Sequence, residues 1–292
     1  MKAILAVLLL GLLSFVPAVP NDYTTKVQTG GEIEATYIKN GNYQVKYLEE
    51  KTTEDFKKYE VYYPQNIVSS TEKYPVVVVL NGTGVYAHKY KALFRHLASW
   101  GFIVLGNEDP STCKGTSADK TLAFILDKNK DSNSIFYNKI DTDNIGASGH
   151  SQGGVGVINA ITVNEHGSMY KTAVALSPTN EIGAKDLNMA YDITKVKIPL
   201  LMMAGTKGDF ETKMVLPLDI MIQMYEKLNV QKVMMRKTDI EHGGMLYEAD
   251  GYVTAWFMWH LKNDNYAAKA FKGTNAEIFN NKLYQDVKSN IK

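Results

Sequence analysis

A glycine-rich stretch between two apolar segments restricts the fold of this chain more than any other feature. Residues 146–154 read GASGHSQGG, after a short apolar segment and before the continuous apolar run VGVINAITV. A strand, a sharp turn that carries serine, and a helix form the context of the G-x-S-x-G nucleophile elbow. Gly149 and Gly153 would keep the strained backbone at Ser151 free of clashes. We interpret Ser151 as an activated nucleophile; the alternative is a glycine loop with an incidental serine.

Apolar strands alternate with helical segments on both sides of this turn. Residues 76–80 read VVVVL, a β-branched run typical of a strand that is buried on both faces. Further strands are expected at 101–106, 143–148, 172–177, 198–205 and 231–237, and helices at 88–100, 118–129, 155–163, 218–228 and around 256–261. The segments 30–38, 42–48 and 57–64 alternate polar and apolar residues, which predicts antiparallel edge strands.

This pattern predicts one α/β domain with a mainly parallel central sheet, antiparallel N-terminal strands and helices on both faces. The domain would span residues 19–292, with a core at about 59–262 and a polar tail at 263–292. Ligands of such sheets collect at the carboxyl ends of the strands. The loops expected at that edge are NGTG, GHSQGG, AGTKGDFE and TDIEHGG. Their convergence is the basis of the functional prediction.

A serine hydroxyl needs a base in contact and a third group that orients the base. Of the six histidines, His242 directly follows a strand, so its loop reaches the same edge as Ser151. Asp209 follows the strand IPLLMMAG and is expected to accept the imidazole Nδ1–H. Its nearby rivals are Glu211, Asp219 and Glu181. The order Ser151, Asp209, His242 is that of the α/β-hydrolases.

The reaction also needs hydrogen-bond donors for the developing oxyanion. We assign this role to the backbone amides of Gln152, at the start of the post-elbow helix, and Thr83, in NGTG. The residues Asn81-Gly82-Thr83 are also a glycosylation sequon. Because a glycan there would obstruct the site, we interpret the sequon as coincidental.

Composition and termini limit the remaining possibilities. The chain of 292 residues is 45% hydrophobic, and its formal net charge of +1 without a basic stripe argues against nucleic-acid binding. Cys113 is the single cysteine, so an intrachain disulfide is impossible. Residues 1–18 combine Lys2, a short apolar core and small residues near a cleavage point. They predict a signal peptide and a secreted or periplasmic protein without stable membrane insertion; the alternative is an uncleaved anchor.

With these motifs the chain resembles the α/β-hydrolase superfamily, and within it the lidless serine esterases around cutinase-type polyester (PET) hydrolases, chlorophyllases and dienelactone hydrolases. The resemblance covers about residues 59–261 and rests on YPVVVVLNGTG, LASWGFIVLG, GHSQGG, IPLLMMAGTKGD and EHGG. It implies hydrolysis of small-molecule or polymeric esters, with no cofactor and no metal. The nucleophile, acid, base and oxyanion donors of the family fall on Ser151, Asp209, His242, Thr83 and Gln152.

Departures from the polyester hydrolases concern the substrate. Those enzymes usually have an aromatic residue in place of Thr83, methionine in place of Gln152 and tryptophan in place of Asn180, and they commonly carry a disulfide. Because these features are missing, the resemblance does not by itself imply stacking against an aromatic polymer, and whether aromatic polyesters are accepted stays open. Dienelactone hydrolases have cysteine at the elbow, where this chain has Ser151.

The substrate site is expected to be open. About twenty residues separate the strands TAVALS and IPLLMM, too few for a cap domain, which suits bulky or extended esters. Tyr86 and His88, in the loop after the oxyanion residues, are expected to line the acyl pocket. His150, in the elbow, and Asn180, after TAVALS, complete the substrate-binding candidates.

Alternative functions remain open. An NAD(P)-binding oxidoreductase would use residues 82–87, GTGVYA, which fit G-x-G-x-x-A, with Glu108 and Asp109 ending the next strand. Against it, the next helix begins near His88, too late for its N-terminus to hold a pyrophosphate. An inactive hydrolase used for binding would keep the fold, and a serine peptidase or acyltransferase would keep the triad.

Overall fold

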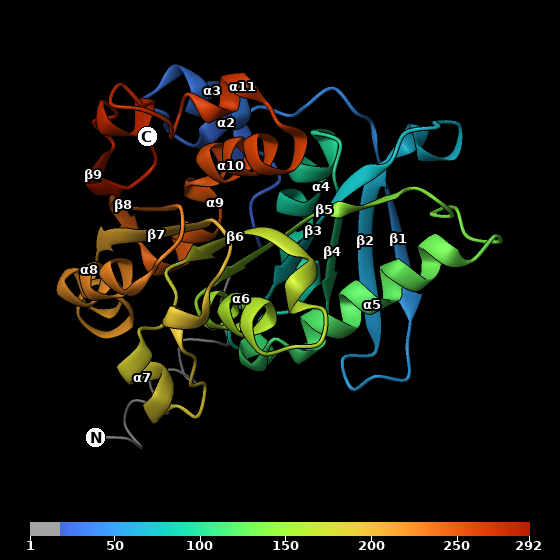
Figure 1. The fold of residues 1–292 in the computed structure, drawn as a ribbon, viewed down its shortest axis with the longest axis horizontal. Helices are drawn as coiled ribbons and strands as arrows, with labels where there is room; N and C mark the ends of the chain where they lie inside the picture. The colour runs from blue at the N-terminus through green and yellow to red at the C-terminus, as the bar shows by residue number, and fades with distance from the viewer. Residues whose placement is uncertain (1–17) are drawn as a thin grey trace.

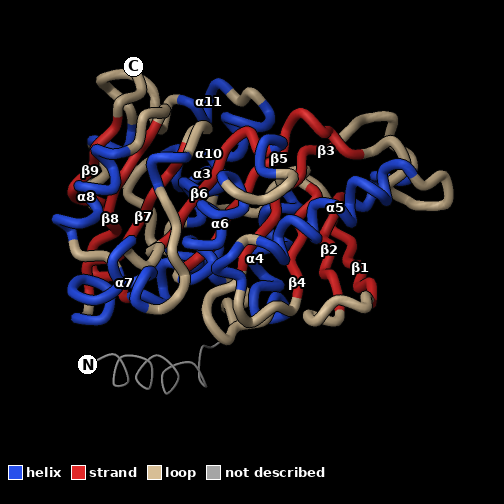
Figure 2. Tube along the Cα trace, turned by 60° about the horizontal axis from the view of Figure 1, so that its bottom comes forward, coloured by secondary structure: helices blue, strands red, loops and turns tan. Residues whose placement is uncertain are grey.

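A single nine-stranded sheet forms the centre of the molecule (Figures 1 and 2). The computed structural model describes residues 18–292. The strand order is β1-β2-β4-β3-β5-β6-β7-β8-β9, with parallel pairing from β4 through β8 and antiparallel pairing at both edges. The strands are β1 (Val45–Lys51), β2 (Lys58–Pro64), β3 (Tyr74–Leu80), β4 (Ile103–Asn107), β5 (Ile140–His150), β6 (Tyr170–Leu176), β7 (Leu200–Lys207), β8 (Lys232–Glu241) and β9 (Tyr284–Ser289). The predicted fold class, a mainly parallel sheet with antiparallel N-terminal strands, is confirmed.

Strand β3 shows how the sequence covers both faces of the sheet. Every residue of this strand is buried. Val77 and Val79 pack into the core on one face, whereas Val76, Val78 and Leu80 pack into the core on the other. Side chains alternate along a strand, so a continuous β-branched run satisfies two apolar layers at once.

Helices form one layer on each face of this sheet (Figure 1). On the first face lie α2 (Tyr23–Lys26), α3 (Glu32–Tyr37), α4 (Lys91–Ser99), α9 (Met245–Glu248), α10 (Asp250–Lys262) and α11 (Asn265–Ala268). On the second face lie α5 (Thr116–Lys130), α6 (Gln152–Thr162) and α8 (Leu218–Lys227). The short helix α7 (Glu181–Asp186) packs Ala184 against Val155 of α6.

The first segment that alternates polar and apolar residues, 30–38, does not form the predicted strand. Its central residues form helix α3 instead. The carboxylate of Glu277 accepts the amide hydrogens of Ile33 and Glu34 at 2.7 and 2.9 Å. An anion at these otherwise unpaired amides stabilises the start of a helix. Because Glu277 lies near the other end of the chain, no local pattern could have indicated this contact.

The predicted polar tail also belongs to the folded core. After α10 the chain forms α11 and the 3₁₀-helix η8 (Glu277–Phe279), and β9 then pairs antiparallel with β8. Phe271 and Ile278 are completely buried on the first face of the sheet. The core therefore extends well beyond residue 262.

No cap domain interrupts the described part of the chain between β6 and β7. Residues 177–199 contain only α7 and the 3₁₀-helix η5 (Ile193–Lys195). Residues 1–17, and thus nearly all of the predicted signal peptide, lie outside the described residues. Among residues 18–292, no helix combines the length and apolar character that crossing a bilayer requires.

Candidate active site

Ser151 lies in a sharp turn between β5 and α6. Its backbone has φ 60° and ψ −121°, a strained conformation for a residue with a side chain. A Cβ atom on Gly149 would lie 2.3 Å from the Gly153 carbonyl oxygen, and one on Gly153 would lie 2.2 Å from the Leu80 carbonyl oxygen. Strand and helix therefore approach so closely that only glycine fits, as a nucleophile elbow requires. The Ser151 amide donates to the Leu176 carbonyl at 2.9 Å, which ties the turn to β6.

The loop after β3 is held against this turn. The Gly82 amide donates to the Tyr90 hydroxyl at 3.0 Å, and a Cβ on Gly82 would lie 3.5 Å from the His150 carbonyl oxygen. Within residues 18–292, the amides of Thr83 and Gln152 have no hydrogen-bond partner. Two unpaired donors beside a nucleophile are what an oxyanion site needs. Both amides are therefore free to donate, and the assignment of Thr83 and Gln152 as oxyanion donors stays a prediction.

The sequon in this loop cannot carry a glycan in the folded protein. Asn81 is buried, and its Nδ2 donates to the carbonyls of Asn107 and Asp109 at 2.6 and 3.0 Å. Thr112 donates its hydroxyl to the Asn81 carbonyl at 2.7 Å. Asn81 therefore anchors the loop from inside, which agrees with the interpretation of the sequon as coincidental.

His242 begins the 3₁₀-helix η7 (His242–Gly244), directly after β8. Its Nδ1 lies 2.6 Å from Oε2 of Glu211, whose side chain is completely buried. Oε1 of Glu211 accepts the Ser177 hydroxyl at 2.5 Å and the Gly205 amide at 2.8 Å. Burial alone would raise the pKa of Glu211, but the hydrogen bonds from His242, Ser177 and Gly205 lower it below the ordinary value. Glu211 is therefore an anion that fixes the histidine ring.

Asp209, the acid expected from the sequence, does not contact His242. Its side chain is 77% exposed and forms an ion pair with Lys213 at 2.9 Å, one turn along the same helix. Glu211 follows in the short π-helix η6 (Phe210–Val215), which turns its carboxylate inward. The structure thus corrects the position of the acid by two residues. The other rivals lie elsewhere: Asp219 is exposed on α8, and Glu181 pairs with Lys227 at 2.6 Å.

His242 is brought to the elbow by contacts with its neighbours. The Phe210 ring meets it edge-on at 5.0 Å between centroids, and the His150 ring lies at 4.5 Å. Since His150 directly precedes Ser151, these contacts place His242 beside the turn. Within residues 18–292 no hydrogen bond joins Ser151 Oγ to His242 Nε2, a contact that is often long in hydrolases without substrate.

His150 supports the loop of His242, and its burial leaves little surface for the predicted contact with a substrate. It is buried, and its Nε2–H donates to the His242 carbonyl at 2.7 Å. Burial and the neighbouring His242 lower the pKa of His150 to about 3, so its ring is neutral at neutral pH. Its place in the site is therefore structural.

Asn180 is also structural in this arrangement. It is buried at the start of α7, where its side-chain oxygen accepts the amides of Ile182 and Gly183 at 3.1 and 3.0 Å. Its Nδ2 donates to the carbonyls of Met214 and Val215 at 3.1 and 2.9 Å. With every polar group of the side chain engaged, the expectation that Asn180 contacts the substrate is not met. It joins α7 to η6 instead.

Tyr86 and His88 are the two exposed residues among the predicted substrate-binding residues. The Tyr86 side chain is 41% exposed and stacks on His88 at 5.7 Å between ring centroids. His88 is itself held by Glu108, which accepts its amide at 3.0 Å and faces its Nδ1 at 2.9 Å. The pair thus forms an aromatic surface on the connection that follows the oxyanion loop.

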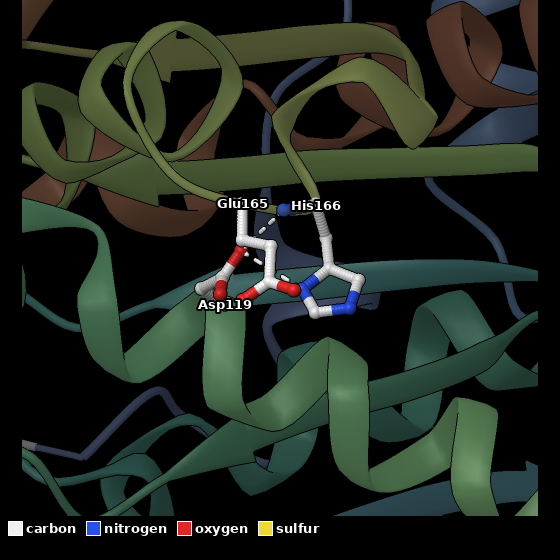
Figure 3. A group of neighbouring side chains, drawn as sticks. All are labelled: Asp119, Glu165 and His166. Carbon is white, nitrogen blue, oxygen red and sulfur yellow. Dashed lines mark hydrogen bonds and ion pairs between the residues drawn. The ribbon is translucent and has the colours of Figure 1, made fainter.

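A separate cluster of metal-ligating side chain types lies on the second helical face. Asp119 of α5, Glu165 and His166 converge with their ligand atoms within 4.8 Å of one another (Figure 3). The His166 amide donates to Asp119 Oδ1 at 2.8 Å, and its Nδ1 lies 3.2 Å from the same oxygen. These contacts join His166 to Asp119, and the cluster shares no residue with the surroundings of Ser151.

The dinucleotide-binding alternative is not supported by the loop after β3. The glycines lead into the 3₁₀-helix η2 (Ala87–Tyr90), and α4 begins only at Lys91. Glu108, the candidate ribose ligand, is occupied by His88. A helix N-terminus is thus missing from the place where a pyrophosphate would need it.

Comparison with known proteins identifies the family of this chain. A search of curated proteins found no match. A family model described as PET hydrolase-like matches residues 23–278, which include the elbow, the acid and His242. The match covers most of the chain and agrees with the α/β fold. The protein therefore belongs to the PET hydrolase-like family of α/β-hydrolases, whose activity is the hydrolysis of esters.

Proposed function

We propose that this protein is a serine carboxylic-ester hydrolase that works through an acyl-enzyme, with Ser151 as nucleophile, His242 as base and Glu211 as acid. One observation carries the proposal. His242 is held by a buried carboxylate at Nδ1 and lies beside the strained turn of Ser151. The Gln152 amide in this turn and the Thr83 amide in the loop after β3 are both without a partner among residues 18–292. A base, its orienting acid, a nucleophile and oxyanion donors together define this chemistry.

In the acylation step, Ser151 Oγ attacks the ester carbonyl carbon while His242 Nε2 takes the hydroxyl proton. Glu211 keeps the Nδ1–H in place and stabilises the imidazolium that forms. The carbonyl oxygen becomes an oxyanion that accepts the amides of Thr83 and Gln152, each worth about 3 kcal/mol in the transition state. The intermediate then expels the alcohol, which receives the proton from Nε2.

Deacylation repeats these steps with water. His242 removes a proton from the water, whose oxygen attacks the acyl carbon, and the same amides hold the second oxyanion. Collapse of this intermediate returns the proton to Ser151 Oγ and releases the acid. An amine or a second alcohol in place of water would turn the same acyl-enzyme into an acyltransferase.

The connections around the elbow favour bulky or extended esters. Tyr86, Ile182 and Met214 are 41%, 66% and 36% exposed on segments that leave the carboxyl edge of the sheet. The short link between β6 and β7 carries no cap domain over them. Apolar side chains beside an uncovered site suit an ester whose acyl or alcohol part has apolar surface to bury.

The proposal is tested with the substitution Ser151→Ala. We expect turnover of p-nitrophenyl acetate and butyrate to fall by several orders of magnitude, while the melting temperature changes little. Wild-type protein should be labelled by a fluorophosphonate at Ser151, as peptide mass spectrometry would show. Undiminished turnover by the Ser151→Ala variant would disprove the serine mechanism.

We further propose that residues 1–18 direct export and are then removed. The support is the sequence pattern of a signal peptide. N-terminal sequencing of protein collected from the periplasm or the medium should begin at Val19. An intact Met1 on exported protein would contradict cleavage.

A further inference from the structure

Ser177 has an unusual backbone conformation at the end of β6. Its φ is 42°, in the left-handed region that residues with a Cβ rarely adopt. The residue is completely buried, and its amide donates to the Met203 carbonyl of β7 at 2.6 Å. Strained positions persist where the surrounding structure requires them, and they are concentrated at functional sites.

The side chain of Ser177 shows what this conformation achieves. Its hydroxyl donates to Glu211 Oε1 at 2.5 Å. The same oxygen accepts the Gly205 amide at 2.8 Å, while Oε2 faces His242 Nδ1 at 2.6 Å. The two donors on Oε1 fix the rotation of the carboxylate, so that Oε2 is the oxygen directed at the ring.

The surroundings of Glu211 make this hydroxyl important. The carboxylate is completely buried, and the contacts that lower its pKa come from His242, the Ser177 hydroxyl and the Gly205 amide. Asp209 and Lys213, on the same helix, pair with each other at the surface. A buried carboxylate must therefore rely on its few hydrogen-bond donors to remain ionised.

We propose that Ser177 is a positioning residue for the triad acid: its hydroxyl holds the Glu211 carboxylate in the rotation that presents Oε2 to His242. This inference rests on the proposed function, which it deepens. Sequence reasoning did not identify Ser177, because a serine that ends a buried strand carries no local signal of this role.

Two substitutions of Ser177 separate the effect of losing its hydroxyl from the effect of relieving its backbone strain. Ser177→Ala removes the hydroxyl and keeps the Cβ atom, whereas Ser177→Gly removes the hydroxyl and also relieves the left-handed backbone. Ser117→Ala is the control, because the Ser117 hydroxyl is buried without a hydrogen-bond partner on α5. The variants are compared by melting temperature, and by kcat and KM for p-nitrophenyl acetate.

We expect both Ser177 variants to lose about 10- to 100-fold in kcat with little change in KM, whatever the order of their melting temperatures. With one donor fewer, the Glu211 carboxylate becomes a stronger acceptor for the imidazolium. In the acidic limb of the kcat/KM profile, activity falls as His242 becomes protonated. This limb should therefore move to higher pH in the variants. The Ser117→Ala control should match the wild type in both measurements.

Two results would overturn the proposal. One is an unchanged kcat in both Ser177 variants. The other is a fall in kcat that equals the loss of folded protein, with the acidic limb unmoved. Fluorophosphonate labelling of Ser151 in the wild type keeps this outcome distinct from failure of the serine mechanism, because labelling does not depend on the identity of residue 177.

Discussion

Oε2 of Glu211 lies 2.6 Å from Nδ1 of His242, although Asp209, two residues earlier, is the first carboxylate after β7. The difference comes from the backbone between them. Asp209 stands just before the π-helix η6 and is exposed, whereas Glu211 lies in the first turn of η6 and is buried against Nδ1 of the histidine ring. Short π-helical turns are rare and often occur at functional sites.

This relationship predicts that one of two conservative substitutions abolishes most of the activity and that the other leaves it nearly unchanged. Glu211→Gln keeps the shape of the side chain but removes the charge that orients and stabilises the imidazolium. We expect kcat for p-nitrophenyl acetate to fall by about 10³- to 10⁴-fold. Asp209→Asn should stay within about twofold of the wild type, because exposed ion pairs contribute little.

Steady-state kinetics on both variants, with circular dichroism to verify folding, is the required measurement. A nearly inactive Asp209→Asn protein beside an active Glu211→Gln protein would reverse the assignment. It would mean that the loop rearranges during catalysis and exchanges the two carboxylates.

The central fold could be predicted because its signals are local. Val76 to Leu80 can fill both faces of a sheet only as a buried central strand, and the close approach of the backbone around Ser151 leaves room only for glycine at 149 and 153. Helix α3 could not be predicted, because its first turn depends on Glu277. The alternation in EIEATY fits a strand as well as a short helix.

The sequence was enough to predict which loops form the candidate site, but not which side chains in them make the contacts. The strand ends bring His242 and the elbow together, which follows from the topology of a parallel sheet. Which of two nearby carboxylates faces the ring depends on one π-helical turn, and the sequence contains no sign of it. The roles of His150 and Asn180 depend on contacts with the carbonyls of His242, Met214 and Val215, which become visible only in three dimensions.

Asn180→Ala should act on stability and not on substrate affinity. The change removes the cap of α7 and two hydrogen bonds to η6, which we expect to cost about 2 kcal/mol of unfolding free energy. Urea denaturation measures that cost, and KM for p-nitrophenyl butyrate should change little. A large rise in KM at unchanged stability would return Asn180 to the substrate site.

Tyr86→Ala tests the aromatic surface beside the oxyanion loop. The exposed ring has apolar area that a long acyl chain can cover, worth about 1 kcal/mol or roughly fivefold in KM. We expect this increase for p-nitrophenyl octanoate and not for the acetate. Tyr137→Ala is the matched control, because Tyr137 is similarly exposed, at 42%. It lies just before the first residue of β5, whereas Ser151 follows the last residue of that strand. Equal effects of the two substitutions would show that Tyr86 is not part of the acyl site.

His150 should make the folded protein sensitive to acid. Its pKa is lowered to about 3, mainly by burial, whereas an unfolded histidine titrates near 6.5. Between these values the unfolded chain binds a proton that the folded protein does not. The contribution of His150 to stability is therefore complete above about pH 6.5 and decreases on acidification, by up to about 1.4 kcal/mol per pH unit.

The substitution His150→Gln removes this titration. The unfolding free energy of the variant, measured by urea denaturation from pH 4 to 7, should therefore decrease less steeply than that of the wild type. His260, whose pKa is lowered to about 4, keeps some slope in both proteins. Parallel curves for the two proteins would mean that His150 accepts a proton in the folded state, and that its bond to the His242 carbonyl does not require a neutral ring.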